Sequence, residues 1–493
     1  MKTQSRMFFN ALMLTLAVLL SGLQLHAQNR RPDRRPLRET STSDQEPQSQ
    51  EIYNKVTASL RQLDYPVNQL STGASYIPDQ LMAWYTPEQM NNIEQIRARG
   101  SKLFGNNFEV VKTCGCKGKF QIELYEVRGM DAKEEGDSGS NKAAKAMGIK
   151  EEDQQDNLYV FPDIPQGINQ YAQAFGTLNS FSVKKSQKTA TPIPIAILDT
   201  GIDHRYQDQS VNGEPALVFW ENDKDPVDGQ DDPDDPFCLT DDIIGWDFVN
   251  DDNNPMDDHS HGTHLAGIVV RELRQHQPDI NYQLMALKVM DANGVGNTFD
   301  AVCSILYAAE KGARVINASW GFYGGSEKLL QRAIRYAASK GAVFVNAAGN
   351  ERADLAVTNY YPAEYALTTR NSIRGLMFVG ALGKTGDLWS DTNIRTEGIK
   401  QDGFVATPGE DIRSLIPLHL RGKVSATKSG TSMATPVMSA IMANYIHTFP
   451  SHSPAKIRSS ILNEILTTIP SKTITRYGKV YPYYPVEWLD FSP

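Results

Sequence analysis

The stretch IPIAILDTGID, residues 193–203, joins an uninterrupted apolar run to a turn that begins with a carboxylate. A run without alternating polar residues is typical of a parallel strand that is buried on both faces of a sheet. Similar apolar runs follow at 282–290, 313–319, 342–348 and 375–382. The intervals leave room for helices, so the sequence predicts an α/β domain with a buried parallel sheet over residues 191–466. Functional side chains in such sheets gather at the carboxyl ends of the strands.

The length and composition are those of a globular protein with more than one folded unit. The chain has 493 residues, of which 40% are hydrophobic and 22% charged, enough to bury a sizeable core. Its formal net charge is −9, and no basic patch with interleaved aromatic residues occurs. Nucleic-acid binding is therefore unsupported, and we expect a monomer.

The first 27 residues follow the pattern of an export signal. Lys2 and Arg6 precede an apolar run at 8–20 that is too short to span a bilayer comfortably, and Ala27 supplies a small residue for cleavage. We expect export to a periplasm or to the medium, with a single membrane anchor as the alternative. No later segment is apolar enough to cross a membrane. Residues 28–50, rich in Arg, Pro, Ser and Gln, are predicted to be a disordered linker.

Residues 51–163 have the pattern of a small α+β domain. Strands are predicted at 80–85, 108–113, 119–127 and 158–161. After the first strand, Thr86 and Gln89 occupy the two positions of a capping box, with a proline between them at the first helical position. With a short Ala-rich helix before the last strand, the order is βαββαβ, which predicts a ferredoxin-like fold. Residues 164–190 are predicted to be a linker, and the tail 467–493 gives no clear prediction.

Three motifs place an acid, a base and a nucleophile in that order along the chain. Asp199 follows the first apolar run, so its carboxylate emerges at the end of a strand, where it can orient an imidazole. His261, in HSHGTHLAGIV at 259–269, precedes a helical run and can act as a general base. Ser432, in SGTSMATP at 429–436, opens a helix whose N–H groups favour a developing oxyanion. A serine needs such a base to be a good nucleophile, so the three residues predict acyl transfer.

Further residues would hold the oxyanion and the substrate. Asn350 ends the apolar run FVNAAGN and can donate a side-chain hydrogen bond to the oxyanion, beside the backbone N–H of Ser432. The stretches GVGN and SWG can each pair with an extended peptide, which main-chain hydrogen bonds would hold with modest side-chain selectivity. The predicted peptide-binding residues of these stretches are Gly294, Gly296, Ser319, Trp320 and Gly321.

Each member of the predicted triad also has an ordinary explanation: a helix N-cap, a surface histidine and a turn residue after a strand. Their joint occurrence with Asn350, each at the expected end of its element, favours the catalytic interpretation. We interpret His264 as structural. A metal site formed by His259, His261 and His264 is the alternative, but the spacing is not that of zinc peptidases and their glutamate is lacking.

Taken together, these motifs resemble those of the subtilisin-like serine peptidases, from about Thr191 to Leu466. The order Asp, His, Ser is the one known for subtilisin. The resemblance implies a three-layer α/β domain with the three residues as its triad and Asn350 in its oxyanion hole. It also implies that the first domain is an inhibitory, folding-assisting propeptide, removed by autoprocessing between about Asp163 and Ala190.

Two positions complicate the resemblance at the specificity pocket. Tyr360, just before Tyr361-Pro362, stands where this family often has glycine at the pocket floor, which predicts a shallow pocket. Glu351 directly follows Asn350 and falls on the pocket rim, where its charge can favour a basic side chain on the acyl side of the cleaved bond. The two features point in partly different directions.

The segment 221–258 lies between two triad candidates and contains fourteen aspartates, one glutamate and one lysine. Carboxylate and amide oxygens are the ligands that Ca²⁺ prefers, and folding so much like charge without a counterion is costly. The resemblance agrees, since relatives often bind structural calcium. No EF-hand spacing occurs, so a structural calcium ion is expected without assigned ligands, and a solvated acidic loop is the alternative. The chemistry itself requires no cofactor.

The four cysteines, Cys114, Cys116, Cys238 and Cys303, are too few for a disulfide scaffold in a chain of this size. An exported chain can form a strained Cys114–Cys116 disulfide. Zinc is disfavoured because a second cysteine pair and a nearby histidine are lacking. Cys303 lies in an apolar helical run and is predicted to be a small core residue.

We therefore expect an exported serine endopeptidase, made as a zymogen, that hydrolyses protein through an acyl-enzyme. The expected partners are protein or peptide substrates and the chain's own propeptide. A catalytically silent peptide-binding pseudo-peptidase, an exopeptidase and a peptide ligase on the same scaffold are the alternatives. The complete triad with Asn350 favours an enzyme, because a binding module has no need of all four residues.

Overall fold

The computed structural model describes the chain from residue 46 to residue 491 with gaps. The gaps are 116–119, 130–138, 165–168, 170–172, 174, 179–182, 184–190, 208–215, 226, 231–234, 367–371, 396–403, 421–422 and 477–478. The predicted export signal and most of the predicted linker, up to residue 45, lie outside the described residues. From Gln48 onward the chain forms one compact unit.

A nine-stranded sheet forms the centre of the larger part of this unit, in the order β18-β19-β15-β14-β12-β10-β6-β8-β7. All neighbours from β19 to β7 pair in parallel, and only β18 is antiparallel to β19. The strands are β6 Ile193–Asp199, β7 Gly245–Asp247, β8 Tyr282–Lys288, β10 Val315–Ala318, β12 Val343–Ala347, β14 Leu376–Leu382, β15 Val405–Pro408, β18 Lys472–Arg476 and β19 Lys479–Pro485. The five predicted apolar runs are β6, β8, β10, β12 and β14, and the buried parallel sheet is confirmed.

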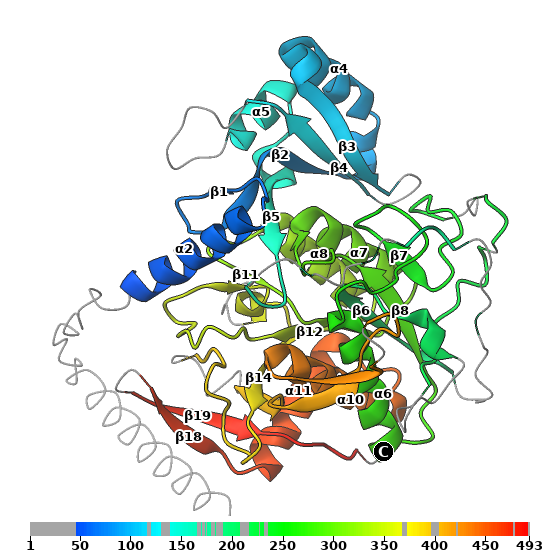
Figure 1. Cartoon of the computed structure of the whole chain (residues 1–493). Helices are drawn as coiled ribbons and strands as arrows, with labels where there is room; N and C mark the ends of the chain where they lie inside the picture. The colour runs from blue at the N-terminus through cyan, green and yellow to red at the C-terminus, as the bar shows by residue number, and fades with distance from the viewer. Residues whose placement is uncertain are drawn as a thin grey trace, which may run out of the picture. The chain divides into compact units, whose positions relative to one another are not determined.

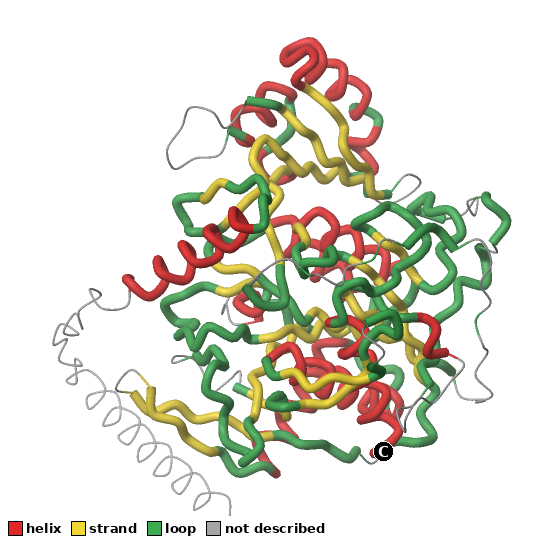
Figure 2. Tube along the Cα trace, in the orientation of Figure 1, coloured by secondary structure: helices red, strands yellow, loops and turns green. Residues whose placement is uncertain are grey.

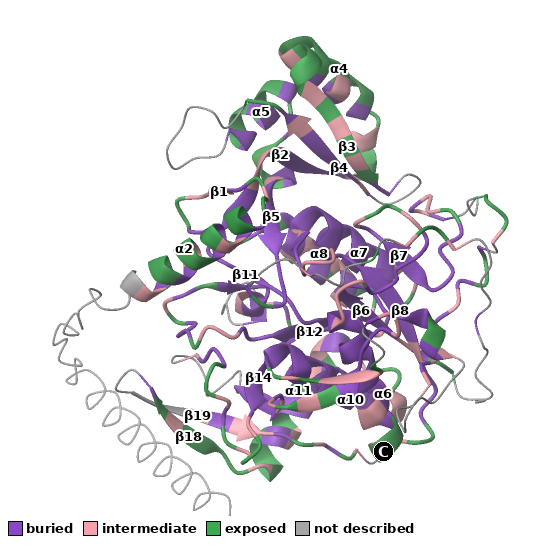
Figure 3. Cartoon of the chain, in the orientation of Figure 1, coloured by how far each residue is buried: buried purple, intermediate pink, exposed green. Residues whose placement is uncertain are grey.

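Helices cover both faces of this sheet (Figures 1 and 2). On one face lie α7 and α8, and on the other α6, α10 and α11; their bounds are α6 His261–His276, α7 Thr298–Glu310, α8 Lys328–Ser339, α10 Thr431–Thr448 and α11 Pro454–Thr468. Alternate residues of β6 face the two layers: Ala196 and Leu198 pack in the core with α7 and α8, whereas Ile195 and Ile197 pack with α6 and α10. The predicted three-layer arrangement is therefore confirmed, and Figure 3 shows its central strands β6, β8, β12 and β14 buried.

The N-terminal module, residues 46–160, contains a second, antiparallel sheet. Its strands are β1 Asn68–Gln69, β2 Ser75–Tyr85, β3 Phe108–Cys114, β4 Gln121–Val127 and β5 Gln154–Val160, and its helices are α2 Glu46–Gln62, α3 Pro87–Met90, α4 Ile93–Phe104 and α5 Ser140–Met147. The four long strands follow the order β3-β4-β2-β5, and the elements from β2 to β5 follow the predicted βαββαβ order. As the capping box requires, the Thr86 backbone N–H donates to Gln89 Oε1 at 2.7 Å.

Two segments differ from the sequence prediction. Helix α2 begins at Glu46, so the predicted linker is wrong over residues 46–50; Ile52, Val56 and Leu60 recur at helical spacing and are buried. At the other end, the tail without a prediction forms β18 and β19, and β19 pairs with β15. The main sheet therefore continues beyond the predicted domain end at residue 466.

Short elements complete the described chain. They are the strands β9 Gly296–Asn297, β11 Phe322–Tyr323, β13 Tyr360–Tyr361, β16 Ile412–Leu415 and β17 Ser425–Lys428, and the 3-10 turns Gly105–Asn107, Glu151–Asp153, His204–Gln207 and Ala363–Ala366. Among the helices that the structure describes, none has the length and apolar character needed to cross a membrane.

The cysteines differ in part from the prediction. Cys114 and Cys303 are buried free thiols, so the Cys114–Cys116 disulfide is wrong. Cys238 is disulfide-bonded, and Cys116 lies outside the described residues. Cys303 is 1% exposed within α7, and its prediction as a small core residue is confirmed.

Candidate active site

Asp199 and His261 meet at the carboxyl edge of the main sheet. Asp199 is the last residue of β6, and His261 is the first residue of α6. The Asp199 Oδ1 atom lies 2.7 Å from Nδ1 of His261 and also accepts the backbone N–H of Thr200 at 2.9 Å. Both side chains are buried. This contact fixes the imidazole orientation and leaves Nε2 as the atom available for proton transfer.

A buried carboxylate, Asp257, fixes the turn that leads into α6. Its oxygens accept the backbone N–H groups of His259, Ser260 and Thr263 at 2.8–2.9 Å and the Thr200 hydroxyl at 2.8 Å. Burial acts to raise the pKa of Asp257, but these hydrogen bonds outweigh burial and lower it. The sequence analysis did not identify Asp257, because nothing local distinguishes it from the other thirteen aspartates of the acidic segment.

Ser432 occupies the second position of α10 and is buried. Its hydroxyl lies 3.1 Å from the Ser319 carbonyl oxygen and 3.4 Å from the Pro162 carbonyl oxygen. Within the described residues the hydroxyl therefore contacts backbone carbonyls rather than His261; catalytic hydrogen bonds of this kind often tighten only in the reacting complex. Pro436 lacks the N–H that would bond the Ser432 carbonyl, and the Ser319 hydroxyl donates to that carbonyl instead, at 3.1 Å.

Asn350 has its amide orientation fixed by Thr431. The Thr431 backbone N–H, which can only donate, lies 2.9 Å from Oδ1 of Asn350, and the Thr431 hydroxyl donates to the same oxygen at 2.9 Å. This identifies the accepting atom and leaves the Nδ2 group as the free donor. The backbone N–H of Gly349 in turn donates to the Thr431 hydroxyl at 3.1 Å. Thr431 was not identified from the sequence as a positioning residue, although it lies in the quoted SGTSMATP motif.

The two predicted peptide-binding stretches pair with the chain's own residues 159–161. In β9, Gly296 and Asn297 pair antiparallel with the end of β5, Val160 with Gly296 and Tyr159 with Asn297. On the other side, Phe161 and Gly321 exchange two backbone hydrogen bonds of 3.1–3.2 Å. An extended segment therefore lies between both stretches and leads to Ser432.

Of the five predicted peptide-binding residues, Gly296 and Gly321 pair with this segment, whereas the Trp320 side chain lies in the core. Gly294 opens the stretch that leads into β9 and has a φ of +74°, which glycine adopts without strain. Ser319 contacts Ser432 through its hydroxyl and its carbonyl. The Trp320 side chain is fully buried, and its Nε1–H donates to the Leu198 carbonyl at 2.9 Å.

Asp163, two residues after Phe161, lines a pocket together with Asn350, Glu351 and Tyr360, and its own surface stays partly exposed. Only about 10 Å³ of free space remains there. Burial, followed by the nearby charge of Glu351, raises the pKa of Asp163 to about 6. The Tyr360 side chain is buried against the Tyr323 ring, with ring centroids 4.8 Å apart. The structure thus brings Glu351 and Tyr360 into one pocket, which Asp163 also lines.

Comparison with known proteins agrees with this geometry. Residues 191–479 match the Subtilase family. The chain belongs to this family. It is similar to a thermophilic serine proteinase of Bacillus sp. (strain AK1), 31% identical over 298 residues that cover 60% of this chain and 61% of that protein. It is also similar to thermitase of Thermoactinomyces vulgaris, 33% identical over 251 residues that cover 50% of this chain and 81% of that protein.

The subtilase thus spans about three fifths of the length of the first of these relatives. Among solved structures, it is similar to a cold adapted subtilisin-like serine proteinase, 21% identical, with a TM-score of 0.38, over 59% of this chain and 88% of that one. The family match covers β6 to the start of β19 and includes all four candidate catalytic residues.

The other histidines near the site of this subtilase are neutral and structural in character. Burial lowers the pKa of His264 to about 3, and its Nε2 atom contacts the Ala426 carbonyl at 3.0 Å. Burial likewise lowers the pKa of His259 to about 3. Across the described residues, no group of three or more His, Cys, Asp or Glu side chains is arranged to hold a metal ion.

Part of the acidic segment is compensated within the subtilase itself. Lys311, which directly follows α7, lies 3.0 Å from Asp242 and 3.4 Å from Asp235. The Asp247 carboxylate accepts the backbone N–H groups of Val249 and Asn250 at 2.9 Å. Asp235, Asp242 and Asp247 therefore have partners within the protein, and Asp231, Asp232 and Asp234 of the segment lie outside the described residues.

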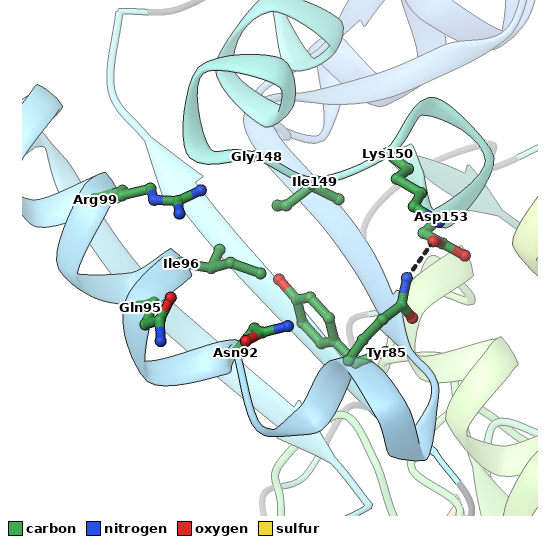
Figure 4. A pocket seen from close by; sticks show the side chains of 10 residues that line it. Tyr85, Asn92, Gln95, Ile96, Arg99, Gly148, Ile149, Lys150 and Asp153 are labelled. Carbon is green, nitrogen blue, oxygen red and sulfur yellow. Dashed lines mark hydrogen bonds between the residues drawn. The ribbon is translucent and has the colours of Figure 1, made fainter.

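The N-terminal module also contains a separate cavity of about 260 Å³, away from the triad. Figure 4 shows Ile96 and Arg99 of α4 facing Ile149 and Lys150 across it. None of its lining residues belongs to the candidate active site of the subtilase.

Proposed function

We propose that this subtilase is an exported serine endopeptidase that is made as a zymogen and hydrolyses proteins through an acyl-enzyme. The observation that carries the proposal is the extended segment 159–163. This segment pairs with both sides of a cleft and places Asp163 in a pocket beside Ser432. A groove that holds a peptide in this way, next to an Asp–His contact, is suited to cleaving peptide bonds.

In the proposed reaction, His261 takes the proton of the Ser432 hydroxyl as Ser432 attacks the peptide carbonyl carbon. Asp199, 2.7 Å from Nδ1, orients the imidazole and stabilises the imidazolium that forms. The Asn350 Nδ2 group and the Ser432 backbone N–H then donate to the oxyanion. The imidazolium passes its proton to the leaving amine, and water, activated by the same histidine, hydrolyses the acyl-enzyme.

The N-terminal module is proposed to be the inhibitory propeptide of this enzyme. Its last strand, β5, leads without interruption into the segment that occupies the cleft. Because Asp163 ends the segment that pairs with both stretches and lines the pocket beside Glu351, the proposal puts the first autoprocessing cleavage between Asp163 and Ile164. Once the pocket is empty, Glu351 on its rim would favour a basic substrate side chain, and the buried Tyr360 ring would keep the pocket shallow.

Export and calcium binding complete the proposal. The charged start, the short apolar run and Ala27 favour an export signal. The disulfide at Cys238 fits an oxidising compartment. The aspartates of residues 221–258 that Lys311 and backbone N–H groups do not compensate would bind a structural calcium ion.

A fluorophosphonate probe tests the catalytic proposal, because it labels only an activated serine. We expect the matured wild type to be labelled, the Ser432→Ala variant to remain unlabelled, and the purified Ser432→Ala variant to keep its N-terminal module. Mass spectrometry of products from a mixed peptide library would show internal cleavage. An unlabelled wild type would favour the pseudo-peptidase, and only terminal cleavage or joined peptides would favour an exopeptidase or a ligase.

A further inference from the structure

Helix α2 and the turn after it, residues 49–66, precede the βαββαβ unit and contact both walls of the cleft. We call this segment the clasp. It contributes no strand to the segment 159–163 that occupies the cleft. Its polar contacts are instead with side chains of the two walls between which that segment lies.

On the pocket wall, the clasp contacts Glu351 and Thr358. Lys55 Nζ lies 2.9 Å from Glu351 Oε2, and the Lys55 side chain is 47% exposed while that of Glu351 is 14% exposed. The Ser49 and Thr358 hydroxyls form a hydrogen bond of 2.7 Å, and both residues are buried. A charged contact and a buried neutral contact therefore join the first half of the clasp to this wall.

On the opposite wall, the clasp contacts the loop that leads into β9. The Tyr65 hydroxyl donates to Asp291 and accepts a hydrogen bond from Asn293 at 3.0 Å. Asp291 also holds its own loop, because its Oδ1 atom accepts the Val295 backbone N–H at 3.0 Å. The clasp is further joined to the occupying segment, since the Tyr159 hydroxyl donates to the Pro66 carbonyl at 2.6 Å.

The charges at the pocket explain why such a contact is useful. Asp163 and Glu351 are two carboxylates that line one pocket, with the Glu351 side chain 14% exposed and Asp163 more exposed, and like charges this close destabilise each other. Lys55 contacts Glu351 directly, and its charge also acts to lower the pKa of Asp163. Without Lys55, Glu351 would lose its direct cationic partner while Asp163 occupies the pocket.

We propose that residues 49–66 form a second inhibitory element, in which Lys55 neutralises Glu351 so that the acidic segment end at Asp163 stays in the pocket after cleavage. The inference rests on the proposed function. Helix α2 would then control how fast the cleaved strand that ends at Asp163 leaves the cleft. Cutting the clasp, or displacing Lys55 with a cationic competitor, would free the active site. The exposed Lys55 side chain makes this contact the accessible one.

The test measures the interval between two events in the refolded full-length chain: cleavage of the N-terminal module, seen on gels, and fluorophosphonate labelling of Ser432. The interval reports release of the cleaved strand. Since a partly exposed ion pair contributes about 1 kcal/mol, Lys55→Ala should shorten the interval about fivefold, and Lys55→Glu should shorten it further. Cleavage itself should keep its rate. Arg61→Ala, an exposed position on the same helix, is the matched control and should behave as wild type.

A second comparison separates the ion pair from a merely structural role of α2. In a Glu351→Gln background Lys55 loses its direct ion-pair partner and keeps only the more distant charge of Asp163, so Lys55→Ala should shorten the interval much less. An equal effect in both backgrounds, or an unchanged interval in both Lys55 variants, would overturn the inference. Failure of the proposed function looks different, because the wild type would then be neither cleaved nor labelled.

Discussion

At the scale of single residues, hydroxyl groups fix the side chains that are proposed to react. Thr431 donates to Asn350 Oδ1, and Thr200 donates to Asp257, which holds the turn before His261. Neither threonine has chemistry of its own in the proposed reaction. Thr431 fixes the side-chain orientation of Asn350, and Thr200 fixes that of Asp257. Because the Asn350 donor is already oriented, little free energy is lost in orienting it when the oxyanion forms.

Replacing Asn350 tests the oxyanion donor directly. Asn350→Ala should lower kcat by about 10²–10³ with little change in KM, because the Nδ2 donor acts mainly on the charge that develops in the transition state. Thr431→Val should give a smaller loss of the same kind, and Thr431→Ser, which keeps the hydroxyl, should restore activity. Steady-state kinetics on a peptide substrate measure all three. A loss confined to KM would place Asn350 in substrate binding instead.

Asp163 makes release of the cleaved strand depend on pH. Its pKa is about 6 in the pocket against a usual 3.8, so the docked state retains a proton that the released carboxyl loses. Docking is therefore strongest below about pH 4, weakens as the pH rises towards 6, and levels off above 6. We expect the interval between cleavage and labelling to be shorter at pH 7 than at pH 5.

The control for this pH dependence is Asp163→Asn, which cannot ionise at the pocket. The ratio of the intervals at the two pH values should fall towards one in this variant, while the effects of His261 on labelling stay in both proteins. A wild-type ratio equal to that of Asp163→Asn would show that another group controls release.

At the scale of elements, local pattern predicted β6, β8, β10, β12 and β14, because strands buried on both faces are apolar throughout. Helix α2 was missed because its first residues are polar and its buried stripe is narrow. The β18–β19 pair was missed because β18 is largely exposed and its pattern resembles a loop. The triad candidates could be predicted because each lies in a short motif. The pairing of β5 with β9 could not, because it joins residues far apart in the chain.

At the start of α10, the Ser319 hydroxyl replaces the backbone N–H that Pro436 lacks as the donor to the Ser432 carbonyl. Ser319→Ala should lower the free energy of unfolding by about 1–3 kcal/mol, because the Ser432 carbonyl then loses its buried donor. In a Pro436→Ala background the helix regains its own N–H donor, so Ser319→Ala should cost less. Denaturant unfolding in Ser432→Ala chains, which do not autolyse, measures both differences. Equal costs in the two backgrounds would contradict this replacement.

At the scale of the whole molecule, polar contacts join the N-terminal module to the domain that matches the Subtilase family, residues 191–479. Lys112 of β3 pairs with Asp300 of α7 at 3.1 Å, and Arg332 of α8 pairs with Asp153 at 3.1 Å. Together with the β5–β9 pairing, these contacts place the module over α7 and α8 and direct its last strand into the cleft. Sequence alone predicted both folds but not this docking, since the contacting residues carry no local signal.

The acidic segment gives a prediction about the stability of the whole molecule. If it binds calcium, a chelator should lower the Tm of the Ser432→Ala chain, because a ligand at 100 times its Kd stabilises the folded state by about 2.7 kcal/mol. Added Ca²⁺ should restore the Tm, and Mg²⁺ at the same concentration should not, since it demands a tighter octahedral geometry. Asp242 is already paired with Lys311, so Asp242→Asn should leave the chelator effect unchanged. An unchanged Tm in the parent chain would identify the segment as a solvated acidic loop whose charge Lys311 and backbone N–H groups compensate.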